Sequence, residues 1–371
     1  MDKQEAQFEM GLVAAAENGD AYCYPCSLVV LPDGKLMTSF TKVIASGPNK
    51  GRAGGCVCSS LDHGKSWTKP EVLFFDDSPF ISPPTMDQDF GDPSICVFPD
   101  KVVIYCQSVD HIQGRPDLSC SREWFRISYD YGLSWSPVNS REFHRKYYAG
   151  TKHAGLTLHD DSVIRGYSWD FNAENGIHTD GEGDQIYYSG LLKTTDGGEH
   201  WIPQPDLTVK DRSANAKPYA IQGAGEPAYV ELADGSLYML LRTGTERLWE
   251  TRSYDCGLSW QDPVPSELVS HNCPAALLRA SDGDIVVIYN DHPLERAKLC
   301  VRASSDGCRT WSKPKVFAPA ESVNEPEASY PVICQLDNGL FVAVWGQVMR
   351  NREDNFKIYY ARFNKEWIIR S

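Results

Sequence analysis

The sequence has no long apolar run and no excess of basic residues. No segment approaches the roughly 18 consecutive apolar residues of a membrane-spanning helix, so the sequence predicts no membrane span. The 371 residues include 36 Lys and Arg against 50 Asp and Glu, a formal net charge of −14. Because nucleic-acid affinity depends on cations that neutralise phosphates, this balance disfavours nucleic acid and anionic membranes as partners. A small acidic ligand is not excluded, since a few arginines in one pocket can outweigh the overall field.

A signal peptide and a paired zinc motif are also missing. The first 20 residues have no basic segment leading into an apolar stretch, although a chain whose leader had been removed, and which was secreted or periplasmic, would look the same. There are twelve cysteines, but only one CxxC, formed by Cys23 and Cys26. Most cysteines stand where a buried strand takes a small apolar residue, which favours free thiols over disulfides or a metal site. Free thiols in a chain without a leader indicate the cytoplasm, and nothing in the sequence calls for a cofactor or a metal.

A motif of the form S/T-x-D-x-G-x-x-W occurs five times, with Cys308 in place of the glycine in the last copy. Its aspartates are separated by 68, 66, 59 and 51 residues, and they are Asp62, Asp130, Asp196, Asp255 and Asp306. Repeats at such a period are typical of propellers, solenoids or arrays. The carboxylate can accept backbone N–H groups of a tight turn, the glycine supplies a positive φ, and the Trp can pack beneath the turn. The motif therefore predicts a structural turn rather than five catalytic aspartates.

Six hairpins of two apolar strands follow one another along the chain. Most of their turns contain Asp-Gly or Asn-Gly, and they begin at Ser27, Ser94, Gly155, Pro227, Pro274 and Pro331. Five are followed by a copy of the motif, and the sixth by the strand-like "KIYYARFNKEW". Completed by an outer pair of strands, six hairpins predict an all-β, six-bladed β-propeller with four antiparallel strands per blade.

One closed domain is expected over residues 1–371, with the last blade completed by the chain ends. The expected blades are approximately 22–76, 77–145, 146–210, 211–268, 269–320 and 321–371. Two long insertions, residues 77–92 and 169–186, are interpreted as loops over a binding face.

Polar residues flank the apolar strands where the inner strands of a propeller converge. Directly before the hairpins stand Tyr24, Asp92, His153, Glu226, the stretch His271–Asn272–Cys273, and Tyr330. The second hairpin strands end on Lys42, Gln107, Asp170, Arg242, Asn290 and Gln347, and a loop adds Arg296. Acids, phenols, an imidazole and cations are the kinds of group that make up acid–base catalytic sites. Each residue also has a structural interpretation, such as a turn cap for Asp92 or an aromatic wall for Tyr330, so the prediction depends on their shared location.

The repeated turns and six hairpins resemble the sialidases (neuraminidases) and the wider group of BNR-repeat, Asp-box glycosidases. The resemblance covers the chain from about Tyr22 to Ile369. In sialidases three arginines bind the substrate carboxylate, a tyrosine assisted by a glutamate is the nucleophile, and an aspartate is the acid/base. The segment "GEPAYVELADGSLYMLLR" is similar to the one that holds the glutamate and the second arginine, here Glu226 and Arg242. "NDHPLERAKLCVRASSDG" and "ASYPVICQLDNGLFVAVW" are similar to the segments of the third arginine and the tyrosine, here Arg296 and Tyr330.

Two positions depart from the sialidase pattern. The family's first arginine precedes the first hairpin, where this chain has "CYPCSLVV" with Tyr24 and no arginine. The loop that usually carries the aspartate, "KVIASGPNKGRAGGCVCSS", contains no Asp or Glu, and its cations include Lys42 and Arg52. Asp92, Asp170 or His153 would have to supply the acid. In related propeller glycosidases two carboxylates replace the tyrosine pair, and Glu226 with Asp92 would be such a pair.

The sequence thus predicts a glycoside hydrolase that acts at the end of a glycan, on sialic acid or another acidic or acylated sugar. Its catalytic candidates are Glu226, Asp92, Tyr330 and His153, with a carbohydrate as the only expected partner. Two alternatives stay open: a non-catalytic propeller that binds carbohydrate or protein, and a sugar lyase or epimerase on the same scaffold. His153, Tyr330 and Tyr24 would suit proton abstraction beside a carboxylate.

Overall fold

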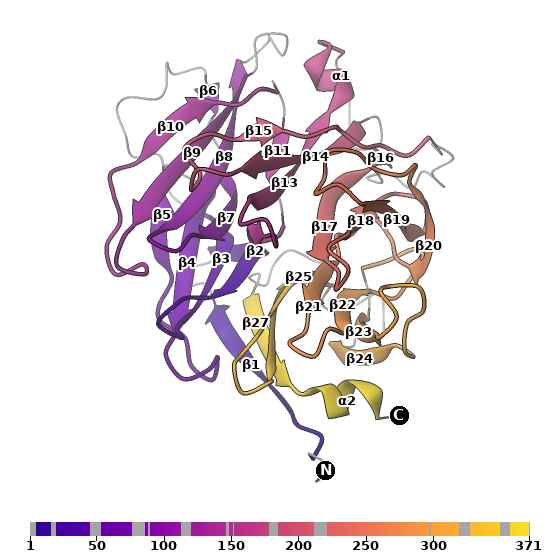
Figure 1. Cartoon of the computed structure of the whole chain (residues 1–371). Coiled ribbons are helices and arrows are strands. Elements are labelled where there is room, and N and C mark those ends of the chain that lie inside the picture. Colours follow the sequence, from indigo (N-terminus) through magenta and orange to yellow (C-terminus); the bar gives the residue numbers. More distant parts are fainter. Residues whose placement is uncertain are drawn as a thin grey trace.

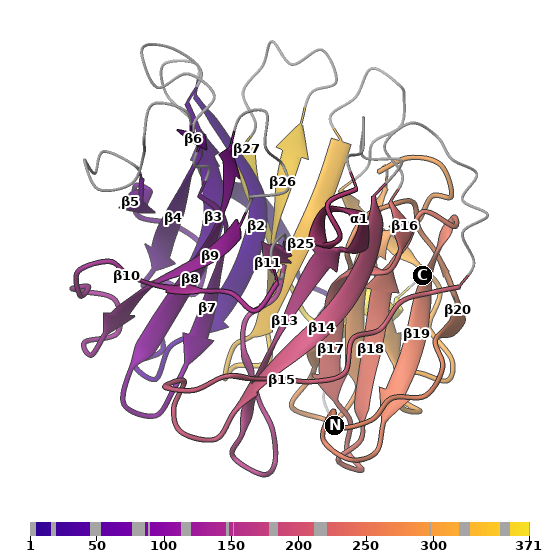
Figure 2. The same ribbon diagram turned by 90° about the horizontal axis from the view of Figure 1, so that it is seen from above.

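The computed structural model confirms a six-bladed β-propeller (Figures 1 and 2). It describes residues 5–15, 20–44, 53–75, 86–87, 90–112, 120–145, 148–150, 152–177, 185–210, 221–296, 298–318, 327–348 and 357–370. Arg52, most of the first predicted insertion and residues 178–184 of the second lie outside these ranges. Of the two helices in the part of the chain that the structure describes, neither has the length and apolar composition to cross a bilayer.

The first three sheets come from the N-terminal part of the chain. Blade one consists of β2 (Ala21–Val30), β3 (Leu36–Val43), β4 (Ala53–Ser60) and β5 (Glu71–Phe74). Blade two consists of β7 (Gly91–Val97), β8 (Val102–Ile112), β9 (Cys120–Ser128) and β10 (Asn139–Glu142), with the short β6 (Met86–Asp87) beside β8. Blade three consists of β11 (Tyr148–Gly150), β12 (Leu156–Thr157), β13 (Val163–Asp170), β14 (Ile186–Thr194), β15 (Ile202–Pro203) and β16 (Gln222–Gly223). In blade three the innermost strand is split, because β11 and β12 both pair with β13.

The other three sheets have four strands each. Blade four consists of β17 (Gly225–Glu231), β18 (Leu237–Arg242), β19 (Arg247–Ser253) and β20 (Val264–Val269). Blade five consists of β21 (Ala276–Arg279), β22 (Ile285–Asn290), β23 (Leu299–Ser304) and β24 (Lys315–Ala318). Blade six consists of β25 (Glu327–Gln335), β26 (Phe341–Val348), β27 (Lys357–Phe363) and the N-terminal β1 (Phe8–Ala15). The two short helices are α1 (Phe171–Glu174) and α2 (Lys365–Ile369).

The sheets form a ring because each inner strand contacts its neighbours in the adjacent blades. Strand β2 contacts both β25 and β7, and β17 contacts both β13 and β21, so the first blade lies beside the last (Figure 1). The apolar residues gather between neighbouring sheets, as with Phe40 between blades six and one and Trp345 between blades five and six. Sheets with two buried faces need apolar residues on both, which explains the near-continuous apolar hairpins of the sequence.

The ring is closed by pairing of the two ends of the chain. Strand β1 is antiparallel to β27, with a register that runs from Phe8 opposite Phe363 to Ala15 opposite Lys357. The Asn364 side chain accepts the Gln7 N–H at 3.0 Å and also caps α2. β1 therefore supplies the outer strand of the last blade.

The repeated motif forms the tight turn that its residues predict. In the first copy, Asp62 Oδ1 accepts the backbone N–H groups of Lys65 and Ser66 at 3.0 and 2.9 Å. The Ser60 hydroxyl donates to Asp62 Oδ1 at 2.8 Å and accepts the Gly64 N–H at 2.9 Å. The aspartates of the other copies make equivalent bonds, at Asp130, Asp196, Asp255 and Asp306. All five carboxylates are thus bound within their own turns.

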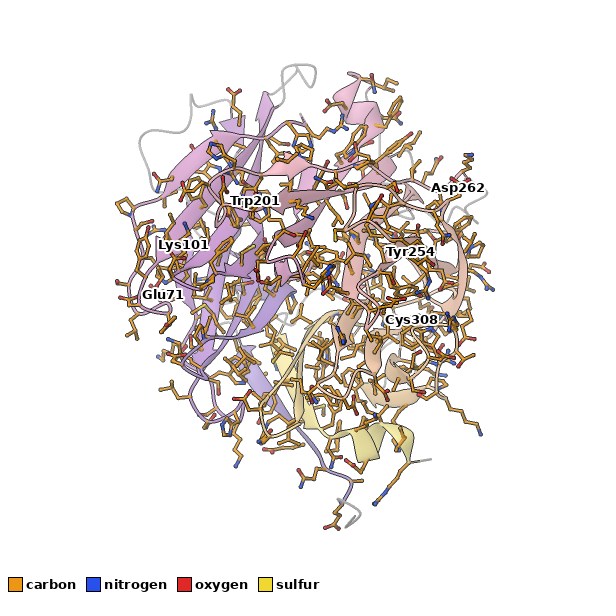
Figure 3. All side chains as sticks on the ribbon, viewed as in Figure 1. Glu71, Lys101, Trp201, Tyr254, Asp262 and Cys308 are labelled. Carbon is orange, nitrogen blue, oxygen red and sulfur yellow. The ribbon has the colours of Figure 1, made fainter. Side chains whose placement is uncertain are left out.

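The turns also connect neighbouring blades. The carbonyl oxygen of Lys65 in blade one accepts the Tyr360 hydroxyl of blade six at 3.0 Å. Trp201 of blade three, labelled in Figure 3, donates its indole N–H to the Tyr105 hydroxyl of blade two at 3.1 Å. Each such contact fixes one sheet against the sheet before it.

These turns predict a pH dependence of stability. Bonds from Ser134 and Ser128 lower the pKa of Asp130 to about 2, from an unfolded value of about 4. A lowered pKa contributes stability that is fully present above pH 4 and lost as the pH falls toward 2. We expect Asp130→Asn to have a lower thermal midpoint than the wild type at pH 6, and the difference to narrow between about pH 4 and 2. A difference that stays constant across this window would contradict the prediction.

Candidate active site

Four inner strands are interrupted at the same place by a β-bulge. In each, the register shifts around an X-Pro pair, because proline has no N–H to donate to the ladder. The residues before the prolines are Tyr24, Asp92, Glu226 and Tyr330, and their φ values lie between 38° and 56°. Positive φ costs such residues on the order of 1–3 kcal/mol and persists where the surrounding structure imposes it, often at functional sites. The bulges thus place four of the predicted side chains at equivalent points around the ring.

Glu226 and Arg242 form a buried ion pair at the inner edge of blade four. Arg242 Nη1 donates to Glu226 Oε2 and also to the Tyr330 hydroxyl, at 3.3 Å from the latter. Its Nε donates to Asn272 Oδ1 at 3.1 Å. One guanidinium therefore joins the predicted glutamate, the predicted tyrosine and a residue of blade five.

Lys152 links the two predicted carboxylates. Its ammonium donates to Asp92 Oδ1 and lies 3.8 Å from Glu226 Oε1. The other oxygen of Asp92 accepts the Gln107 amide at 2.9 Å. Lys152 stands in the gap between β11 and β12, where the innermost strand of blade three is split. Asp92 and Glu226, which are 134 positions apart in the sequence, therefore share one cation.

Three cations from three blades surround Tyr330. Lys152 Nζ lies 5.3 Å from the centre of its ring, and the Arg296 guanidinium carbon lies 5.2 Å from it. Arg242 contacts the hydroxyl group. The ring of Tyr24 packs edge-on against Tyr330 at a centroid distance of 4.7 Å. Tyr24 is 37% exposed, while Glu226, Arg242 and Tyr330 are buried, so Tyr24 is the solvent-facing member of this group.

The cations determine the protonation of the buried groups. Burial favours the neutral acid of Glu226, but Arg242 and Lys152 outweigh it and hold the pKa of this carboxyl below its ordinary value. Burial raises the pKa of the Tyr330 phenol well above its ordinary value, despite the nearby Arg296 and Arg242. At neutral pH, Glu226 is a carboxylate and Tyr330 a neutral phenol. Counted by formal charge, the site has three cations, Lys152, Arg242 and Arg296, and two carboxylates, Asp92 and Glu226, which leaves an excess of one positive charge.

The predicted His153 has other partners. Its Nε2 binds the carbonyl oxygen of Ala275 at 2.7 Å, and its ring is tilted against Tyr229. Burial lowers the pKa of this imidazole to about 4, so it is neutral at physiological pH. His153 therefore connects blade three to blade five, and a catalytic role for it stays a prediction that these contacts do not favour.

Four further predicted residues make contacts outside this group. Lys42 pairs with Asp20 at 2.9 Å. Asp170 caps α1, accepts the N–H groups of Asn172 and Ile186, and has a pKa raised by burial. Asn290 donates to the carbonyl of Ala328 at 2.7 Å. Gln347 lies near the end of β26, opposite Ala328. The structure thus brings together Tyr24, Asp92, Gln107, Glu226, Arg242, Arg296 and Tyr330.

The sequence analysis missed Lys152 and did not single out Asn272. Asn272 orients both arginines, since its carbonyl accepts Arg296 Nε and Nη2 at 3.2 and 2.8 Å while its side chain binds Arg242. Its positive φ of 45° marks it as the blade-five counterpart of the residues in the bulges. Lys152 directly precedes the predicted His153, and blade three has no X-Pro pair to identify which of the two occupies the equivalent position.

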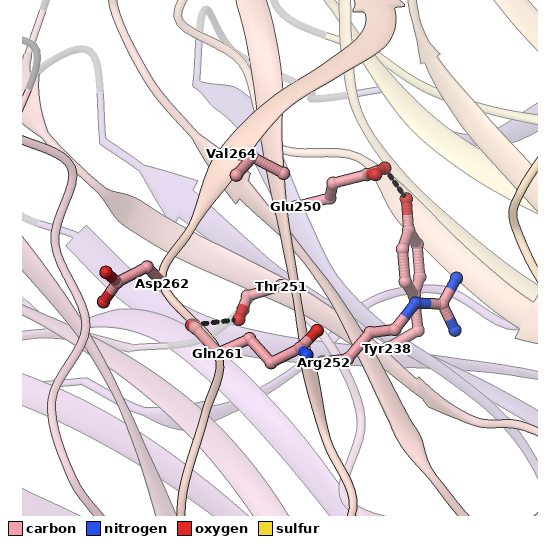
Figure 4. Close-up of a pocket in the computed structure, with 7 residues that line it drawn as sticks. All are labelled: Tyr238, Glu250, Thr251, Arg252, Gln261, Asp262 and Val264. Atoms are coloured by element: carbon pink, nitrogen blue, oxygen red, sulfur yellow. Dashed lines mark hydrogen bonds between the residues drawn. The ribbon is translucent and has the colours of Figure 1, made fainter.

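Two other features of the described residues concern sites outside this group. Within the described ranges, no three His, Cys, Asp or Glu side chains are placed to hold a metal ion. A surface hollow of about 300 Å³ lies beside β19 and β20 (Figure 4). In it the Tyr238 hydroxyl donates to Glu250 at 2.6 Å and the Thr251 hydroxyl to the Gln261 carbonyl at 2.6 Å. These bonds lie within blade four, and Tyr238 is near the opposite end of β18 from Arg242.

Fold and repeats together define a sialidase-like propeller. The model of the BNR repeat-like domain matches residues 100–343, more than half of the chain, and the protein therefore belongs to this family. No curated protein matches the sequence.

Solved structures share the fold at low sequence identity. The chain is similar to the Hadza microbial sialidase Hz136, with 16% identity and a TM-score of 0.70, over 93% of this chain and 66% of that one. It is similar to a Dyadobacter fermentans protein of unknown function, with 15% identity and a TM-score of 0.70, over 96% and 98% of the two chains. It is also similar to the NanB sialidase of Streptococcus pneumoniae, with 13% identity and a TM-score of 0.72, over 96% and 71%. The chain thus spans about two thirds of the length of the two sialidases.

Proposed function

We propose that this protein is a glycoside hydrolase of sialidase-like type, acting on an acidic sugar at the end of a glycan. The observation that carries the proposal is the convergence of three cations on Asp92, Glu226 and Tyr330, which stand at the bulges of the inner strands. An excess of one positive charge suits a substrate with a carboxylate. The sialidase fold of the neighbouring structures supports a carbohydrate as the substrate class.

In the proposed reaction, Tyr330, Glu226 and Asp92 each either form a bond to the sugar or transfer a proton. Tyr330 would attack the anomeric carbon, and Glu226, already a carboxylate, would take up the phenol proton. Asp92, once released from Lys152 and protonated from solvent, would donate that proton to the leaving oxygen, because a carboxylate held by an ammonium group has no proton to give. Water would then attack the anomeric carbon and give a proton to the Asp92 carboxylate, while the bond to the Tyr330 oxygen breaks and Glu226 returns the proton to that oxygen. In the alternative two-carboxylate arrangement, Glu226 itself acts as nucleophile or base and Asp92 remains the acid.

A screen of aryl glycosides and natural glycans, including sialosides and uronosides, tests the proposal by product detection. We expect release of an acidic sugar by the wild type, and a decrease in kcat of about 10²- to 10⁴-fold in Asp92→Asn. The substitution keeps the volume and an acceptor for Gln107 while removing the acid. Full activity of Asp92→Asn would contradict its assignment. Glycan binding without product release would identify a binding propeller instead.

A second candidate function is a lyase that acts on a uronic acid. It is favoured by the pairing of Lys152 with Asp92, which keeps that carboxylate ionised and suited to abstract a proton. Cations beside the sugar carboxylate would stabilise the negative charge that develops on proton removal. The same screen separates the two functions, because elimination gives an unsaturated product that absorbs in the ultraviolet and hydrolysis does not.

A further inference from the structure

The chain lacks the arginine that a sialidase would place before the first hairpin, and the structure places one of the two cations predicted to replace it. Lys42 is paired with Asp20, and Arg52 is outside the described residues. Lys152, from blade three, occupies the side of Tyr330 that faces blades one and two, through its contacts with Tyr24 and Asp92. Together with Arg242 and Arg296 it completes a set of three cations around one phenol.

The three cations differ in how firmly they are held. Arg242 is fixed by Glu226, Tyr330 and the Asn272 side chain, and Arg296 donates twice to the Asn272 carbonyl. Lys152 has one close carboxylate partner, Asp92, and a second at 3.8 Å. The lysine ammonium group is a compact charge at the end of a flexible side chain. Each guanidinium is planar, and its hydrogen bonds to several partners fix its orientation. Lys152 is therefore the cation most able to change partners.

We propose that Lys152 binds the anionic group of the substrate, exchanging its contact with Asp92 for a contact with the substrate carboxylate. The inference rests on the proposed function, since it assigns the acidic-sugar specificity of that same site. In the free protein Asp92 occupies the place of the substrate anion. On binding, the ammonium moves to the substrate and Asp92 is released from its ion pair. One exchange thus couples recognition of an acidic sugar to the freedom of Asp92 to take part in proton transfer.

Binding measurements test this independently of turnover. The probes are N-acetylneuraminic acid and glucuronic acid, each compared by calorimetry with its methyl ester, which lacks the negative charge and carries one added methyl group. We expect the wild type to prefer the acids, and Lys152→Met to bind them about 10- to 100-fold more weakly, the range for loss of a charge-assisted hydrogen bond. Affinity for the esters should change little, and Lys152→Arg should retain the preference because it keeps the positive charge.

Asp92→Asn gives a second test, in which the affinity for the acids is expected to rise instead of fall. Removing the competing carboxylate should tighten binding of the acids, whereas a lysine serving only as a structural partner of Asp92 would give no such gain. This variant decides the question if Lys152→Met fails to fold by circular dichroism. No preference for acids in the wild type, a preserved preference in folded Lys152→Met, or weaker acid binding by Asp92→Asn would each overturn the inference. If the acids bind in the expected pattern but no glycan is cleaved, the role of Lys152 is supported and the proposed hydrolase activity is refuted.

Discussion

Glu226→Gln is expected to lower kcat by about 10²- to 10⁴-fold, measured on whichever acidic glycoside the wild type cleaves. Glutamine keeps the volume and an oxygen acceptor for Arg242, but it cannot take up a proton in the reaction. The substitution also leaves Arg242 and Lys152 near one another without the carboxylate that lies between them. We therefore expect a loss of stability as well, and a fold that survives by circular dichroism.

The stability loss requires a control, because a weakened fold could reduce activity by itself. Glu123→Gln makes the same chemical change at another buried, arginine-paired glutamate, which lies in blade two. If Glu226 acts in catalysis, the two variants should separate: kcat falls in Glu226→Gln and stays within about twofold of the wild type in Glu123→Gln. Equal losses of kcat in both would show that the effect of Glu226→Gln is structural.

Glu123→Gln has the second large expected effect, a decrease of about 3–5 kcal/mol in the free energy of unfolding. Glu123 is fully buried and is paired with both Arg141 and Arg165. The Arg165 guanidinium is enclosed by the rings of Tyr105 and Trp201, at 4.1 and 4.6 Å from their centroids. Without the carboxylate charge, the Arg165 guanidinium between blades two and three loses its ion pair with Glu123, and removing one partner of a buried pair is costly.

Urea unfolding measures this loss as a shift in the midpoint at an unchanged slope. Glu199→Gln is the matched control, because the Glu199 side chain is 65% exposed where it pairs at 3.0 Å with Lys101, which is labelled in Figure 3. Loss of the Glu199 charge should change the free energy of unfolding by less than about 1 kcal/mol. If Glu123→Gln and Glu199→Gln lower the free energy of unfolding by similar amounts, burial does not determine how much the Glu123 ion pairs contribute to stability.

The six sheets could be predicted from the sequence because their signals are local. The turn motif makes its bonds within about seven residues, so each copy specifies the same structure wherever it occurs. The X-Pro pairs are equally local, since proline breaks the ladder in any inner strand. Tyr24, Asp92, Glu226 and Tyr330 could be predicted as equivalent residues for this reason.

The partners of the remaining residues depend on the assembled ring. Asp170 and Asn290 end their second strands just as Arg242 does, but backbone groups near those ends take their hydrogen bonds. Gln107, which the sequence also predicted at a strand end, lies within β8, which continues to Ile112. The choice between Lys152 and His153 is set by the gap between β11 and β12, which contains no X-Pro pair. Alternation along a strand predicts the face of a side chain only while the strand is continuous.

The pairing of β1 with β27 has a consequence for the order of assembly. A ribosome delivers residues 8–15 first and their partners, residues 357–363, last, so the outermost strand of the sixth sheet waits for nearly the whole chain to be made. Until then both the first and the last sheets present unsatisfied faces, which are prone to misassociation in a long chain. Joining these distant segments is the contact with the largest loop-closure cost, and it converts an open arc of sheets into a ring without free ends.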